Sequence, residues 1–301
     1  MARGEKISPD LLDASAIAKA ESLGFAARLL VEGYMAGEHR SPYHGFAIEF
    51  AQHREYSHGD DTRHLDWKVL GRTDRYYIKQ YEQETNFVAH LLVDGSASML
   101  YGSGKLTKFD YARVMAACFA YLVLHQRDAV SLEIFDRETR EQIPRTNSLA
   151  SVHNVIHRLS DFEPSEGSDI ATALHNLALR LRRRGLVIVI SDLMDNEQAV
   201  LDGIRHIRFG GSEVIVFQTL DPHEIEFPFR GVVEFEGLER EPRITTRPDE
   251  IRKSYLEEFG AFRRRIVEGC ERNGCHHVLV NTAHPWEEIL GTYLAFRQRV
   301  G

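Results

Sequence analysis

Side-chain oxygens alternate along Asp94-Gly95-Ser96-Ala97-Ser98, which directly follows an apolar run. Because alternate residues of an extended chain point to one side, the Asp94 carboxylate and the two serine hydroxyls can face a common point. One carboxylate with two hydroxyls is a hard, all-oxygen set that suits Mg²⁺ or Mn²⁺ and not zinc. The pattern alone is weak evidence, since Asp and Ser are also common in turns and at helix N-caps.

Two later loops supply further oxygens. The apolar run Leu186–Ile190 ends in Ser191-Asp192, and Gly167-Ser168-Asp169 precedes a helical stretch. In doubly wound sheets, ligands bind beyond the carboxyl ends of the strands, where the strand order reverses. Three oxygen-bearing loops at strand ends and helix starts therefore favour a metal site over isolated turn residues.

From about Phe87 onward, short apolar runs alternate with helical stretches, which predicts an α/β fold with a doubly wound, mostly parallel sheet flanked by helices. Glu141–Pro144 follows one run closely enough to form an antiparallel edge strand. The runs are typical of strands covered on both faces; they are Val88–Val93, Ala129–Phe135, Leu186–Ile190, Val214–Thr219 and Val278–Asn281. The predicted helices are 108–125, 148–159, 169–184, 197–208, 249–272 and 286–299.

The basic run Arg182-Arg183-Arg184 stands before Gly185. It predicts a helix C-terminus, because cations complement the helix dipole and glycine accepts the left-handed cap. We favour this interpretation over a nucleic-acid patch. The formal net charge of −8 likewise argues against a general nucleic-acid binder, which usually shows a basic face.

The first 85 residues differ in character from the rest. A helical opening over 10–36 gives way to sequence with glycines and aromatic residues, in which Tyr76-Tyr77-Ile78 predicts a strand. We expect residues 1–85 to form an N-terminal extension packed on a main domain of residues 86–301.

The cysteines and the hydropathy point to a cytoplasmic protein. No run approaches the roughly 18 apolar residues of a membrane-spanning helix, and the first residues lack the apolar stretch of a secretory signal. Cys118, Cys270 and Cys275 are odd in number, which indicates no disulfide framework. Cys270, Cys275, His276 and His277 are zinc-type ligands, but strand alternation sends the two histidines to opposite faces, so a structural role is favoured.

The loop with Asp94, Ser96 and Ser98 resembles the metal-ion-dependent adhesion site of the von Willebrand factor type A superfamily. By that resemblance, Ser168 stands where threonine is usual, and Asp192 is the distal carboxylate, which often reaches the ion through water. The serine keeps the hydroxyl but loses the methyl group that restrains the threonine rotamer. The glycine that often follows the last aspartate is a leucine here, a change expected to alter loop shape and not ligand chemistry.

A resemblance over most of the chain is more specific. Segments before the metal loop resemble, in order and spacing, the bacterial family catalogued as domain of unknown function fifty-eight; they are Glu49-Phe50, Arg54-Glu55-Tyr56, Gly59–Trp67 and Lys79–Glu82. Members of that family are typically encoded beside MoxR-type AAA+ ATPases, a pairing associated with assembly or maturation of other proteins. The resemblance thus implies a fold and an ATPase partner, while the client protein stays open.

A cluster in the same extension has two interpretations. Asp60, Asp61, Arg63 and Asp66 mix charges around a turn at Gly59. They could form ion pairs that tie the extension to the sheet domain, or a surface for the ATPase. The sequence does not choose between these.

We expect a non-catalytic adaptor that holds Mg²⁺ or Mn²⁺ and captures an acidic group of a protein partner. One or two carboxylates leave such an ion under-neutralised and with an open position, which a partner's Asp or Glu can fill. One alternative is a metal-dependent hydrolase of a phosphate or ester, for which no general base can be assigned. Another is a scaffold with a vestigial metal loop.

Overall fold

The computed structural model describes residues 48–56, 65–83, 88–125, 127–165, 167–239 and 243–285. They belong to two compact units, one within 37–86 and the other within 87–301. In the smaller unit, β1 (Ile48–Glu55) pairs antiparallel with β2 (Tyr77–Gln83), and α3 (Trp67–Thr73) lies between them in the chain. The predicted strand near Tyr77 is thus present, whereas the packing of 1–85 on the main domain stays a prediction.

The larger unit is built on a six-stranded sheet in the order β10-β7-β6-β3-β4-β5. Its strands are β3 (Val88–Asp94), β4 (Ala129–Phe135), β5 (Thr139–Thr146), β6 (Leu186–Ser191), β7 (Glu213–Leu220) and β10 (His276–Asn281). Neighbouring strands are parallel except β5, which runs antiparallel to β4 at the edge. The predicted α/β fold and its antiparallel edge strand are confirmed.

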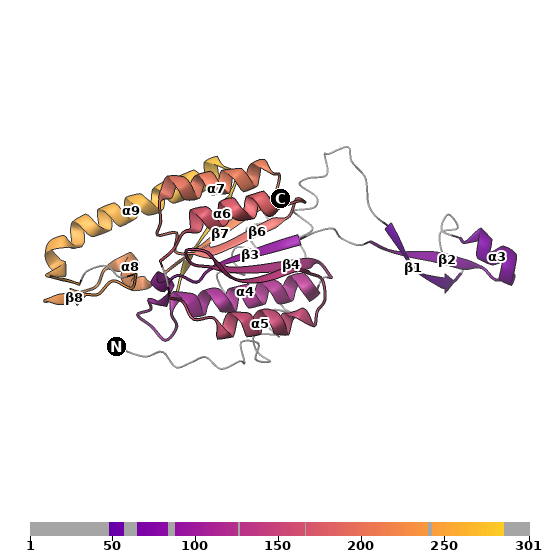
Figure 1. Cartoon of the computed structure of the whole chain (residues 1–301), viewed down its shortest axis with the longest axis horizontal. Helices are drawn as coiled ribbons and strands as arrows, with labels where there is room; N and C mark the ends of the chain where they lie inside the picture. The colour runs from indigo at the N-terminus through magenta and orange to yellow at the C-terminus, as the bar shows by residue number, and fades with distance from the viewer. Residues whose placement is uncertain are drawn as a thin grey trace. The chain divides into compact units, whose positions relative to one another are not determined.

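Helices cover both faces of this sheet (Figure 1). One face carries α4 (Lys108–His125) and α5 (Ser151–Asp161); the other carries α6 (Ile170–Arg180), α7 (Glu197–Phe209) and α9 (Pro248–Arg272). Every residue of β6 and β7 is consequently buried, which explains why β6 is apolar over Leu186–Ile190 and β7 over Val214–Phe217. Each fully buried Val, Leu or Ile contributes about 1.5–3 kcal/mol of transfer free energy.

The strand order reverses between β3 and β6. From β3 the chain proceeds outward through β4 to β5, and from β6 it proceeds the other way through β7 to β10. The carboxyl ends of two adjacent parallel strands therefore open at a topological switch point, the usual ligand site of such sheets. Asp94 ends β3, and Asp192 follows the last residue of β6.

Some local predictions were wrong. The helix predicted to reach 184 ends at Arg180, and Leu181 caps it in an extended conformation, so Gly185 is no C-cap. A Cβ at Gly185 would lie 2.5 Å from the Val88 carbonyl oxygen, so this glycine is needed for close backbone approach. The predicted helices 10–36 and 286–299 lie outside the described residues. Short elements were not predicted: α8 (Pro222–Glu226), β8 (Val233–Phe235) and β9 (Ile244–Thr246).

Among the residues that the structure describes, none of the helices is both long and apolar enough to span a membrane.

Candidate metal centre

The Asp94 carboxylate is fully buried at the end of β3, and a tight turn follows it. The Ser96 N–H donates to Asp94 Oδ1 at 2.9 Å, and the Ser96 and Ser98 hydroxyl oxygens lie 3.0 Å apart. A short 3₁₀ helix, Ala97–Leu100, begins directly after Ser96. The alternation expected from the sequence therefore places the two hydroxyls side by side.

Gly95 is required for this turn. Its N–H donates to the Phe135 carbonyl at 2.7 Å, which ties the loop to the end of β4. A Cβ at Gly95 would lie 2.4 Å from Phe162 Cε1, inside van der Waals contact. Any larger residue would displace the loop or the ring, so the glycine sets where the oxygens lie.

Two further hydroxyls reach Asp94, one from the loop before α6 and one from the end of β6. The Ser168 hydroxyl donates to Asp94 Oδ2 at 3.4 Å, and the Ser191 hydroxyl donates to the same oxygen at 2.5 Å. Ser191 also accepts from the Leu193 N–H at 2.9 Å. The structure thus brings Ser168 beside Asp94 across 74 residues of sequence. Ser191 was visible next to Asp192 in the sequence but was not assigned a role.

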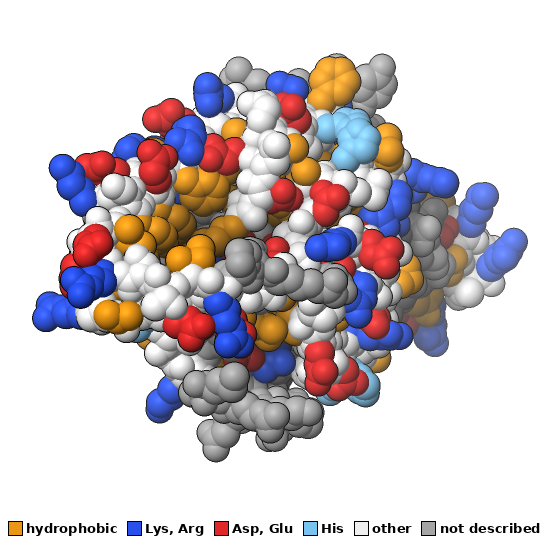
Figure 2. All heavy atoms as spheres, turned by 60° about the vertical axis from the view of Figure 1, so that its left-hand side comes forward, with side chains coloured by type: hydrophobic (Ala, Val, Ile, Leu, Met, Phe, Trp, Pro, Cys, Tyr) orange, Lys and Arg blue, Asp and Glu red, His pale blue; other side chains and the backbone are white. Residues whose placement is uncertain are grey.

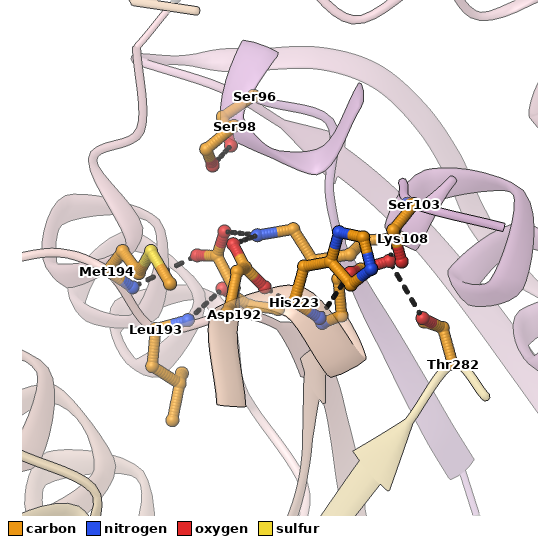
Figure 3. A network of polar contacts seen from close by, with 12 residues as sticks. Ser96, Ser98, Ser103, Lys108, Asp192, Leu193, Met194, His223 and Thr282 are labelled. Atoms are coloured by element: carbon orange, nitrogen blue, oxygen red, sulfur yellow. Dashed lines mark hydrogen bonds and ion pairs between the residues drawn. The ribbon is translucent and has the colours of Figure 1, made fainter. Parts of the chain in front are cut away.

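Asp192 has a different environment, because it pairs with a buried lysine (Figure 3). Lys108 Nζ lies 2.7 Å from Asp192 Oδ2 and 2.6 Å from Glu224 Oε1, and the lysine side chain is fully buried. The other Asp192 oxygen accepts from the Met194 N–H at 3.0 Å. Lys108 is the first residue of α4, where the helix dipole disfavours a cation, so its two carboxylates must stabilise it there.

The two aspartates influence each other electrostatically. Burial, and then the negative charge of Asp192, raise the pKa of Asp94 to about 7, although hydrogen bonds from Ser191 and Ser96 oppose the change. Burial alone would lower the pKa of Lys108, but the charges and hydrogen bonds of Asp192 and Glu224 outweigh it and raise that pKa. Lys108 is therefore charged, while ionisation of Asp94 is disfavoured without a further cation.

Leu193 adopts a backbone conformation that glycine favours, with φ of 61°. Such a conformation costs a leucine about 1–2 kcal/mol. Its side chain is fully buried in the core formed with α6, α7 and α9, which offsets that cost. The loop after β6 therefore holds Leu193 in a glycine-type backbone conformation, and the expected change of loop shape stays a prediction.

The residues present fit a hard divalent cation. Asp94 is a buried carboxylate under the charge of the buried Asp192, the Ser168 hydroxyl donates to it, and the Ser96 and Ser98 hydroxyls lie together in the loop that follows. These are oxygen ligands of the kind Mg²⁺ and Mn²⁺ accept. The described part of the chain contains no group of three His, Cys, Asp or Glu side chains placed to hold a metal. An ion here would therefore depend on the hydroxyls.

The predicted partner cluster is only partly described. Asp60, Asp61 and Arg63 lie outside the described residues. Asp66 is buried and caps α3: its Oδ1 accepts from the N–H groups of Lys68 at 2.9 Å and Val69 at 3.2 Å. This gives Asp66 a structural task, while its role in partner binding stays a prediction.

The cysteines and histidines near β10 have protein partners. Cys270 and Cys275 are buried free thiols. His276 Nε2 lies 3.4 Å from a Glu213 carboxylate oxygen, and His277 Nε2 lies 3.0 Å from Gln218 Oε1. Burial, and then Arg263, lower the pKa of His277 to about 4. These contacts give the two histidines places in the packing of β10 against β7.

The face drawn in Figure 2 carries charges of both signs. On the face drawn in Figure 2, Lys and Arg side chains are interspersed with Asp and Glu side chains, with hydrophobic groups in between. Among the side chains coloured on that face, no continuous basic stripe is visible.

The fold and the site define a class: a doubly wound α/β domain with oxygen side chains gathered at its switch point, the position at which such sheets bind ligands. The family described as "Protein of unknown function DUF58" matches residues 52–265, more than half of the chain. The chain belongs to this family, as the segments before the metal loop predicted.

The individual similar proteins share only low sequence identity with this chain. The chain is 25% identical to the "Uncharacterized protein Rv1480" of Mycobacterium tuberculosis over 302 residues, which covers 96% of this chain and 92% of the relative. The structure of the present chain is similar to that of the conserved hypothetical protein BatB from Bacteroides thetaiotaomicron. The identity is 18%, the TM-score is 0.47, and the match covers 71% of this chain and 99% of BatB. For the SpRpn10 VWA domain the identity is 13%, the TM-score 0.41 and the coverage 69% and 95%.

Proposed function

We propose that this protein is a non-catalytic adaptor that holds Mg²⁺ or Mn²⁺ with Asp94, Ser96, Ser98, Ser168 and Asp192 and binds an acidic group of a protein partner through the ion. The observation that carries the proposal is the meeting of Ser168 and Asp94 at the switch point, with the Ser96 and Ser98 hydroxyls next to each other in the loop that follows. Side chains from distant loops converge on one buried carboxylate, which turn formation alone does not require.

The electrostatics support a binding role for the ion. Asp94 is a buried carboxylate whose negative neighbour disfavours its ionisation, and a divalent cation would relieve that repulsion. When bound, the ion would supply a hard positive centre with an open position. Asp192 is already held by Lys108 and Met194, so it fits the water-mediated position better than direct ligation.

The partner that we propose is a MoxR-type AAA+ ATPase, and the shared task is maturation or assembly of other proteins. This part rests on family membership and not on the site. A pull-down of the candidate ATPase should depend on Mg²⁺ and should be lost in Asp94→Ala. Retention in Asp94→Ala would place the contact elsewhere, with Asp60, Asp61, Arg63 and Asp66 as the next residues to substitute.

The first experiment is calorimetric titration of Mg²⁺ and Mn²⁺ into the wild type and Asp94→Ala. We expect saturable one-site binding in the wild type and none in the variant. Ser160→Ala is a suitable control, because Ser160 Oγ is buried and has no hydrogen-bond partner among the described residues. Metal-dependent turnover of a phosphate or ester that disappears in Asp94→Ala would contradict the non-catalytic assignment.

One observation favours a second candidate, the scaffold whose loop holds no metal. The Lys108 ammonium already supplies a cation to Asp192 inside the protein. If Lys108 takes the place of the ion, neither Mg²⁺ nor Mn²⁺ will bind, and Asp94→Ala will leave partner binding unchanged. The same titration and pull-down therefore separate the two candidates.

A further inference from the structure

Exposed apolar side chains lie at one end of the helix pair α6 and α7. Phe209 is the last residue of α7 and is 92% exposed, and Leu179 is the last residue but one of α6 and is 66% exposed. Other residues pack these helices on the sheet, among them the buried Leu174 of α6 and Ile204 of α7. The packing of the two helices therefore leaves Phe209 and Leu179 in contact with solvent.

Contacts between α6 and α7 bring these two side chains to the same end of the pair. Each helix leads into a parallel strand, β6 or β7, so the helices run in the same direction. His175 Nδ1 of α6 lies 3.2 Å from His206 Nδ1 of α7. Leu179 follows His175 by four residues and Phe209 follows His206 by three, so each lies about one turn further along the same side of its helix.

Arginines gather at this end of the larger unit. Segments 179–185 and 203–213 contain six arginines and one carboxylate, Glu213, although the whole chain has a net charge of −8. The two segments are joined: the Gly185 N–H donates to the Ser212 hydroxyl at 3.3 Å, and the Glu213 N–H donates to the Gly185 carbonyl at 2.9 Å. The loop after α6 and the end of α7 thus form one basic surface.

Three of these arginines carry the argument. Arg182 is exposed in the loop after α6. Arg205 lies 2.8 Å from Asp202, but both side chains are substantially exposed, and such a pair contributes little. Arg208 donates to a neutral group, the Ser212 carbonyl, at 3.1 Å. Three arginines therefore stand against one carboxylate.

The remaining arginines are set aside. Arg180 pairs with Glu133, and Arg183 and Arg184 take part in other interactions. We define the Arg–Phe patch as Leu179, Arg182, Arg205, Arg208 and Phe209.

We propose that the Arg–Phe patch binds the surface of a membrane that contains anionic lipids. The arginines would lie among the lipid phosphates, and Phe209 and Leu179 would reach the boundary of the acyl chains. The net charge of −8 does not prevent this contact, because charges more than about 8 Å away are largely screened at physiological ionic strength.

The shape of the patch favours a lipid surface over a protein or a nucleic acid. A ring that is 92% exposed protrudes, and a protruding ring can enter between lipid molecules without a complementary pocket. Bases of a single-stranded nucleic acid would stack on aromatic side chains, and the aliphatic Leu179 offers no such platform.

The patch lies at the end of the helices that is remote from the candidate metal centre. The helix α6 begins just after Ser168, and α7 begins a few residues after Asp192; both end at the patch. The 11 residues of α6 span about 16 Å at 1.5 Å per residue. A membrane-bound molecule would therefore keep the metal loops away from the lipid and open to a partner. Lipid binding itself does not require the metal.

The test is cosedimentation of the full chain with vesicles. One set contains phosphatidylcholine alone, and the other contains equal parts of phosphatidylcholine and phosphatidylglycerol. We expect binding to the anionic vesicles only, and weaker binding at high salt. Phe209→Ser should lower the partition coefficient about 10-fold, because an apolar ring no longer leaves water. Arg182→Gln should lower it about 5-fold, the effect of one cation near an anionic surface.

Matched controls come from the segment before β8, at the opposite end of the sheet (Figure 1). Val232 is 68% exposed and Arg230 is exposed. Val232→Ser and Arg230→Gln remove an apolar group and a positive charge of the same kinds. Neither should change the partition coefficient.

Phe209→Trp reports insertion directly. This variant should still bind, and lipids with brominated acyl chains should quench its fluorescence beyond the quenching of the wild type. A purely structural effect of position 209 would not produce this signal.

Absence of binding to the anionic vesicles would overturn the proposal. Binding that Phe209→Ser and Arg182→Gln both retain at the wild-type level would overturn it as well, because the contact would then lie elsewhere on the chain.

Discussion

Asp94 and Asp192 follow the same sequence pattern and yet have opposite electrostatic surroundings. Each stands at the end of a buried parallel strand, β3 or β6, and each is fully inaccessible to solvent. Asp192 shares its charge with the Lys108 ammonium, whereas the contacts of Asp94 among the described residues are hydroxyls and a backbone N–H. The comparison shows that two aspartates at neighbouring strand ends can have different charge partners.

The difference identifies Asp94 as the carboxylate that a bound cation would stabilise more. A carboxylate that is buried with only neutral donors is costly unless a cation compensates it, while a buried ion pair is already compensated. The attraction for a divalent ion should therefore be strongest at Asp94, with Asp192 as a pre-organised neighbour. Four predictions test this asymmetry.

Removing the cation should have the largest effect. Lys108→Met leaves Asp192 and Glu224 buried without their partner, so we expect the free energy of unfolding to fall by about 3–5 kcal/mol. Urea denaturation of the wild type and the variant measures the change. Lys105→Met, at an exposed lysine a few residues earlier, should be nearly neutral. A similar small effect for both variants would show that the buried pair contributes little.

Adding a divalent cation should stabilise the protein. With Mg²⁺ or Mn²⁺ at about 100 times the dissociation constant, the free energy of unfolding should rise by about 2.7 kcal/mol. Thermal unfolding with and without the metal checks this. The increase should vanish in Asp94→Ala, and an equal increase in that variant would place the ion elsewhere.

Neutralising each aspartate should change the stability of the metal-free protein in opposite directions. The folded-state pKa of Asp94, about 7, lies above its ordinary value of 3.8, so the folded protein binds a proton that the unfolded chain releases between these pH values. Ionised Asp94 therefore lowers stability as the pH rises from 4 to 7. We expect Asp94→Asn to stabilise the protein at pH 8 by at least about 1 kcal/mol and to have less effect at pH 5.

Asp192→Asn should instead destabilise the protein at both pH values, because it removes one of the two carboxylates that hold Lys108. Urea titrations of both variants at pH 5 and pH 8 measure the contrast. A loss of stability in Asp94→Asn at pH 8 would mean that Asp94 already has a compensating positive charge.

The smallest effect concerns the hydroxyl that links the two strand ends. Ser191 donates to Asp94 Oδ2 and accepts from the Leu193 N–H, so Ser191→Ala leaves a buried carboxylate oxygen and a buried N–H with one partner fewer. We expect a cost of about 0.5–1.5 kcal/mol, the net contribution of one hydrogen bond, because water can take the vacated place. Ser160→Ala, whose hydroxyl has no partner among the described residues, should be close to neutral in the same unfolding measurement.

The amino-acid sequence by itself determined the strands, the α/β class and the first loop of the site. Strands covered on both faces must be apolar throughout, so β3, β4, β6 and β7 are visible as runs of Val, Ile and Leu. The alternation of Asp94, Ser96 and Ser98 is local, and the hydroxyl pair follows from it directly. Features that depend only on residues near one another in the chain can be predicted from the residue types.

Only the tertiary structure decided which distant residues lie beside the candidate site. Lys108 looks like an ordinary residue at a helix start, and Glu239 like one more acid in a loop; neither has a local pattern that marks it. Their contacts arise because the sheet order places the start of α4 and the segment after β8 beside the ends of β6 and β3. Burial and charge compensation depend on neighbours in space, so sequence spacing could not foretell them.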